Sequence, residues 1–157
     1  MFSIKPTWIS FGGTAAIVTS MGLIFGLDAA TGSRQAIVSA LLIVAIADNL
    51  SDSLSVHIYQ EAERLEARKA FLATGANFVT RLLVASSFVV IAIGVPRDLL
   101  PLAAAAWGLL LLALLTYRIA HARGANIRKE IGKHIVIALI VLGISRWLGS
   151  WLAGASG

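Results

Sequence analysis

The chain alternates five long apolar stretches with short polar segments. Each stretch approaches the roughly 20 residues that a helix needs to cross the hydrocarbon core of a bilayer. Such a helix satisfies its own backbone hydrogen bonds in lipid. The pattern predicts an all-α integral membrane protein, a five-transmembrane-helix bundle in one domain over residues 1–157. The spans are expected at about 8–27, 36–57, 77–95, 99–120 and 134–153, with a short charged cytoplasmic helix over 59–73.

Composition supports this prediction and excludes several classes of function. Hydrophobic residues make up 58% of the chain and charged residues 13%, whereas soluble domains carry roughly a quarter charged residues. Cysteine is absent, so no disulfide framework or thiolate metal site is expected. The sequence shows no nucleophile–base arrangement and no phosphate-binding glycine loop. We therefore expect neither an enzyme nor a bound cofactor.

The positive charges are distributed unevenly between the two sides of the predicted bundle. Cations near the N-terminus, after span two and after span four would lie on one side, and the loops of the other side hold only Arg34 and Arg97. With the adjoining helix ends, the first group contains Lys5, Arg64, Arg68, Lys69, Arg81, Arg118, Arg123, Arg128, Lys129 and Lys133. The positive-inside rule then predicts a cytoplasmic N-terminus and an external C-terminus. Topology and contact with anionic membrane lipid explain the net charge of +5, so no nucleic-acid partner is expected. The expected location is the bacterial inner (plasma) membrane.

The second half of span two is unusually polar for a membrane helix. A carboxylate at the centre of a span costs about 2.5–3.5 kcal/mol, and such residues usually face a bundle interior or a water-filled path. At helical spacing Asp48, Asp52 and Ser55 share one face, which Glu63 and Glu66 would prolong. Carboxylate and hydroxyl oxygens suit divalent cations, and a carboxylate inside a membrane can also carry a proton. The stripe therefore predicts an ion path from the cytoplasm toward mid-membrane.

The polar residues of span two, and Met21 of span one, also have purely structural explanations. Asp48 and Asp52 could instead bond to neighbouring helices or pair with Arg81 or Arg146. Met21, expected near mid-membrane, could supply a thioether ligand for a soft or borderline metal, or could simply be packed or face lipid.

Span one carries small residues on one broad face, which lets helices approach closely. The face could serve packing within the chain or a dimer contact. It comprises Gly12, Ala15, Ala16, Thr19 and Gly26, with Gly22 and Gly26 forming a small-xxx-small pair.

Three motifs resemble the vacuolar iron transporter family, small five-helix proteins that move Fe²⁺ or Mn²⁺ out of the cytosol. They are Phe11–Ser20 in span one, Leu54–Val56 in span two and Gly143–Gly149 in span five. The resemblance implies a metal ion transporter and a homodimer with the ion path between subunits.

The chain departs from that family at several positions. An Asp of the family's metal path aligns with Ala15, and a Met and a Glu of its second helix align with Asp48 and Asp52. The family's longer, Glu-rich cytoplasmic insertion is also missing here. The chain is therefore expected to be a divergent, minimal member.

Together these features give two functional hypotheses. The first is proton-coupled export of Fe²⁺ or Mn²⁺, in which Asp48 and Asp52 bind metal and proton in turn. Ser55 and Met21 would add ligands, and Glu63 and Glu66 would collect metal at the cytosolic entrance. The alternative is a non-transporting accessory or scaffold protein that retains the transporter fold.

Overall fold

The computed structural model describes residues 6–62 and 67–155, and these residues form helices and no strand. The elements are α1 (Pro6–Thr31), α2 (Arg34–Ile43), a π turn η1 (Val44–Asp48), α3 (Asn49–Ala62), α4 (Ala67–Gly94), a short 3-10 turn η2 (Arg97–Leu99), α5 (Leu100–Ala122) and α6 (Ile127–Ala155). Within them, 5 segments are long and apolar enough to cross a membrane: Gly12–Thr31, Arg34–Tyr59, Phe71–Gly94, Arg97–Ala122 and Ile127–Ala155. The prediction of an all-α protein with five membrane-spanning helices is confirmed.

The second span is one helix interrupted by a π turn. α2 runs directly into η1 and η1 into α3, with helical backbone angles at both junctions. A π turn inserts an extra residue into the helix and is found disproportionately at functional sites. It rotates everything beyond it relative to a regular helix, and it ends at Asp48.

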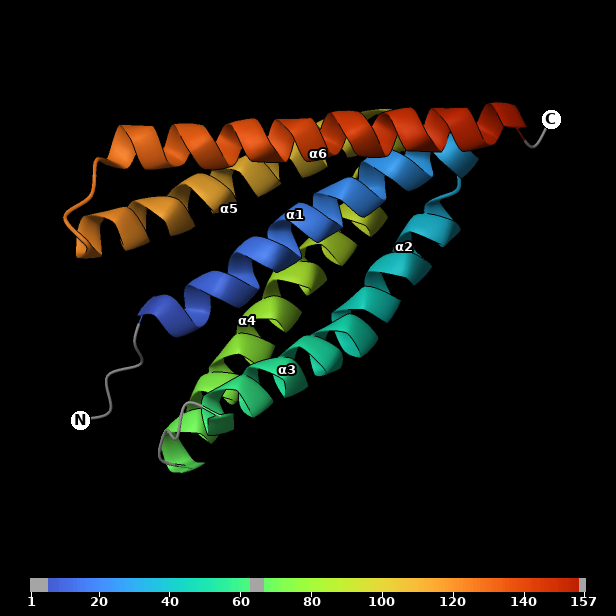
Figure 1. The fold of residues 1–157 in the computed structure, drawn as a ribbon. Coiled ribbons are helices and arrows are strands. Elements are labelled where there is room, and N and C mark those ends of the chain that lie inside the picture. The colour runs from blue at the N-terminus through green and yellow to red at the C-terminus, as the bar shows by residue number, and fades with distance from the viewer. Residues whose placement is uncertain (1–5, 63–66, 156–157) are drawn as a thin grey trace.

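α1 is the central helix of the bundle. It packs against α6, α4, α5 and α2, and Figure 1 shows it running between α6 and α5 on one side and α4 with α2 on the other. α1 begins and α6 ends at opposite ends of the molecule (Figure 1), as an odd number of crossings requires. The core contains Ile17, Met21 and Ile24 of α1, Phe88 of α4, Leu112 of α5 and Leu142 of α6.

The outer surface is strongly apolar, as expected of a surface that faces lipid. Large side chains such as Leu83, Leu102 and Trp147 are about two-thirds exposed, at 66%, 69% and 64%. An apolar surface this extensive would be unstable in water. The chain is therefore a multi-pass membrane protein.

The small-residue face of α1 packs against α6 of the same chain. A Cβ on Gly22 or Gly26 would contact Ser145, and a Cβ on Gly149 would overlap the carbonyl oxygen of Gly26. The span-five segment that carried the family resemblance, Gly143–Gly149, therefore packs on α1 at Gly22 and Gly26, beyond the span-one motif. This contact explains the glycines without a second subunit and leaves the homodimer a prediction.

The charged stretch 59–73 belongs to two helices. Its first residues continue α3 to Ala62 and its last begin α4 at Ala67, so the third span extends further toward the N-terminus than predicted. Residues 63–66, with Glu63 and Glu66, lie outside the described part of the chain.

At the opposite end of the bundle Arg34 ties α2 to α4. Its guanidinium donates hydrogen bonds of 2.7 Å to the carbonyl oxygens of Ile93 and Val95. The last carbonyls of a helix have no partner within the helix, so Arg34 caps α4. This clamp fixes one end of the α2–α4 contact, while the polar residues of α3 and α4 join the two helices further along.

Candidate functional site

The candidate site lies between η1, α3 and α4, where polar side chains gather inside two membrane spans. At about 1.5 Å per residue, Asp48 lies roughly 21 Å along the second span from Arg34, beyond the middle of a bilayer about 30 Å thick. Asp52 lies one turn further along α3. Arg81 lies near the middle of the span Phe71–Gly94. The site is therefore within the membrane by depth.

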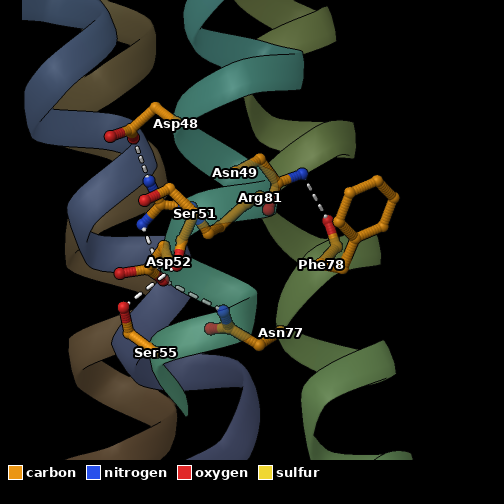
Figure 2. Close-up of polar contacts among 8 residues, drawn as sticks. All are labelled: Asp48, Asn49, Ser51, Asp52, Ser55, Asn77, Phe78 and Arg81. Carbon is orange, nitrogen blue, oxygen red and sulfur yellow. Dashed lines mark hydrogen bonds and ion pairs between the residues drawn. The ribbon is translucent and has the colours of Figure 1, made fainter. Parts of the chain in front are cut away.

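Arg81 joins the two aspartates. Its Nη2 pairs with Oδ2 of Asp48, and its Nη1 lies 3.2 Å from Oδ2 of Asp52. Figure 2 shows the guanidinium reaching from α4 to both carboxylates. A guanidinium is planar and carries several N–H donors in a rigid fork, so one side chain can bridge two acids. Of the two cationic partners that the sequence left open, Arg81 is therefore the one that contacts the acids.

The three members of this cluster differ in exposure. The Arg81 side chain is 5% exposed, whereas Asp52 is 25% exposed and Asp48 50%. The side chain of Arg81 is thus buried between the helices, and the side chain of Asp48 remains half exposed. With both acids ionised and arginine protonated, the cluster carries one net negative charge.

Two asparagines extend the cluster. Asn77 donates from Nδ2 to Oδ2 of Asp52 at 3.1 Å, and Asn49 donates from Nδ2 to the backbone carbonyl of Phe78 at 3.0 Å. Both side chains are almost fully buried, at 2% and 1% exposure. They link α3 to α4 on either side of Arg81 (Figure 2).

Several buried polar atoms at this helix interface have no hydrogen-bond partner among the described residues. They are Oδ1 of Asn49, Oγ of Ser53, Oγ1 of Thr74, Oδ1 of Asn77 and Nε of Arg81. Buried polar groups are normally paired, and each exception calls for a reason. Four of the five are oxygens, so the interface between α3 and α4 has spare acceptors beside the ion cluster.

α1 closes the cluster from a third side. A Cβ on Gly12 would overlap Oδ1 and Cγ of Asn77 and would approach Cγ of Arg81 at 2.9 Å. Asn77 and Arg81 therefore pack directly on the backbone of α1. Only glycine fits at this point without moving those side chains.

The other two predicted ligands make different contacts. Ser55 is exposed, and its hydroxyl donates to the Ser51 carbonyl of the same helix at 3.0 Å (Figure 2). Met21 is fully buried at 0% exposure, and a Cβ on Gly108 of α5 would overlap its Sδ. The structure thus brings together Asp48 and Asp52 but places Met21 in the core between α1 and α5. Within residues 6–62 and 67–155, no three His, Cys, Asp or Glu side chains form a group that could hold a metal ion.

Asn49, Asn77 and Gly12 are parts of the site that the sequence pattern did not predict. A signal for Asn77 exists: it lies four residues before Arg81, which places both on one face of α4, and both are polar in an apolar span. The pairing of that face with α3 has no local signal. No protein-family model, curated protein or solved structure matches this chain.

Proposed function

We propose that this chain exports divalent transition-metal ions, Fe²⁺ or Mn²⁺, from the cytosol in exchange for protons. Asp48 and Asp52 bind the ion within the membrane. The N-terminus is cytoplasmic in this proposal, as the distribution of Lys and Arg favours. The ion enters from the side of Tyr59 and reaches Asp48 along α3.

The half-exposed carboxylate of Asp48 is the observation that carries the proposal. Asp48 lies deep in a membrane span yet keeps 50% of its side-chain surface open. A carboxylate is not stable against lipid tails, and acids at this depth normally face water or protein. The exposed side of the Asp48 carboxylate is therefore expected to face an aqueous path or a second subunit. A water-filled path between two subunits would provide water and protein contacts together.

The oxygen chemistry of the site favours a hard or borderline cation. Two carboxylates one turn apart provide oxygen ligands, and the amide of Asn77 holds Asp52 in place with a hydrogen bond of 3.1 Å. Carboxylates and carbonyls suit Mg²⁺, Ca²⁺ and Mn²⁺, and the resemblance to vacuolar iron transporters narrows the choice to Fe²⁺ or Mn²⁺. Protonation of the same carboxylates when the ion leaves would supply the proton coupling.

The alternative is a non-transporting accessory or scaffold protein, and the contacts of Arg81 favour it. Arg81 pairs with both aspartates, so the cluster could serve only to fasten α3 to α4. In that case the acids hold the fold and bind no exogenous ion.

Metal flux in proteoliposomes distinguishes these two functions. Wild type, Asp48→Asn and Asp52→Asn would be reconstituted with a trapped metal-sensitive dye, and Fe²⁺ or Mn²⁺ uptake followed with and without a pH gradient. Asp98→Asn is the matched control, because Asp98 is an exposed carboxylate in the turn η2. We expect flux in wild type and Asp98→Asn, accelerated by the pH gradient, and at least a tenfold loss in the two span-two variants. No flux from folded wild-type protein would support the scaffold function.

A further inference from the structure

The bridging arginine already supplies part of the positive charge that the acid pair can accept. An arginine side chain carries its positive charge inside proteins, and Arg81 contacts both carboxylates from a buried position. A cation that binds Oδ2 of both acids must therefore replace Arg81 at those atoms. The inference developed from this competition rests on the proposed function, since it assumes that Asp48 and Asp52 bind an ion.

The competition depends on the charge of the incoming ion. A monovalent cation that replaces the guanidinium brings no additional charge and forfeits the directed N–H contacts to Asp48 and Asp52. A divalent cation neutralises both carboxylates once Arg81 has withdrawn. The Coulomb energy of a contact scales with ionic charge and is large where water is scarce. Arg81 therefore weakens the binding of Na⁺ and K⁺ to the two acids far more than it weakens the binding of Mn²⁺ or Fe²⁺.

The displaced guanidinium has alternative partners close by. Oδ1 of Asn77 is a buried acceptor without a partner, one turn before Arg81 on α4, and both side chains pack on Gly12. Oδ1 of Asn49 is a second such acceptor on the facing helix. Buried amide oxygens gain by accepting a hydrogen bond from a charged donor. A change in the side-chain rotamer of Arg81 could therefore release the acids without separating α3 from α4.

We propose that Arg81 is the charge-selectivity residue of the site. Its positively charged side chain excludes monovalent ions from Asp48 and Asp52 and is displaced by divalent ions. Asn49 and Asn77 accept its guanidinium while a metal ion is bound. Arg81 itself does not ligate the metal.

The test compares Mn²⁺ and Na⁺ flux in proteoliposomes of wild type, Arg81→Lys and Arg81→Gln. Arg146→Gln is the matched control, because Arg146 is an exposed arginine at the other end of the bundle, beside Asp28 and Asp98. Wild type and Arg146→Gln should pass Mn²⁺ and hold Na⁺ flux at the protein-free level. Arg81→Gln should raise Na⁺ flux at least about tenfold, because removal of a charge at contact distance changes ion affinity by at least that factor. Arg81→Lys, which keeps the charge, should still exclude Na⁺.

A second variant guards against misfolding of Arg81→Gln. Arg81→Met also removes the positive charge but keeps an apolar stem that can pack like that of arginine, so it should also pass Na⁺. If wild type transports Mn²⁺ and neither Arg81→Gln nor Arg81→Met gains Na⁺ flux, the selectivity role of Arg81 is overturned and the export function stands. If folded wild type transports no divalent ion, the export function fails and this inference fails with it.

Discussion

Gly12 of α1 and Asn77 of α4 approach so closely that no side-chain carbon fits between them. The contact places the central helix of the bundle directly against the polar residues that connect α4 to α3. Asn77 in turn holds Asp52 at 3.1 Å. The backbone of α1 is therefore one wall of the ion cluster, although α1 contributes no charged group to it.

Gly12→Ala should disturb the cluster through this contact. The new methyl group must displace Asn77 and Arg81, and overpacking of this kind costs about 1–3 kcal/mol. We expect a lower thermal unfolding temperature in detergent and slower Mn²⁺ flux. Gly75→Ala is the control, because a Cβ at Gly75 meets nothing within 4 Å and alanine is favoured over glycine inside a helix. Equal behaviour of the two variants would contradict the close packing of α1 on the site.

The charge balance of the cluster predicts an order of stability among its variants. Asp48→Asn/Asp52→Asn leaves Arg81 buried without a counter-charge, and breaking a buried pair in this way costs about 3–5 kcal/mol. Adding Arg81→Met removes the unpaired positive charge and should restore much of the lost free energy of unfolding. Thermal unfolding of the double and triple variants in one detergent measures the difference. A triple variant less stable than the double would show that Arg81 stabilises the helices by its packing rather than by its charge.

The five spans could be predicted from the sequence because length and apolar composition are local properties. The same reasoning found Asp48 and Asp52, since a charge within a span is costly and therefore conspicuous. It could not decide between Arg81 and Arg146 as their partner, because helix periodicity fixes a residue's face and not the helix that the face meets. The π turn at Val44–Asp48 depends on the hydrogen-bond pattern of the folded helix. Gly12 was assigned to a small-residue face, but its contact with Asn77 is visible only once α1 and α4 are packed.

Substitutions of Met21 distinguish a metal ligand in span one from a side chain that only packs in the core. Its side chain is fully buried against Gly108 of α5, so Met21→Leu should be tolerated, because exchanges that conserve core volume usually cost less than about 1.5 kcal/mol. We expect unchanged Mn²⁺ flux in Met21→Leu. Met21→Ala should lower the free energy of unfolding by about 2–5 kcal/mol through the cavity it leaves. Flux lost in folded Met21→Leu would instead show that the thioether belongs to the ion path.

The contact between Gly149 of α6 and Gly26 of α1 decides how the small-residue face of α1 is used. A Cβ at Gly149 would overlap the Gly26 carbonyl oxygen, whereas a Cβ at Gly143 of the same helix meets nothing within 4 Å. Gly149→Ala should therefore force α1 and α6 apart at a cost of about 1–3 kcal/mol, and Gly143→Ala should be neutral or slightly stabilising. Thermal unfolding and light scattering in detergent would be measured together on both variants. Loss of stability with no change in oligomeric state places this face inside the chain, and a proposed dimer must then form elsewhere. A change in oligomeric state from Gly149→Ala, without loss of stability, would assign the same glycines to the contact between subunits.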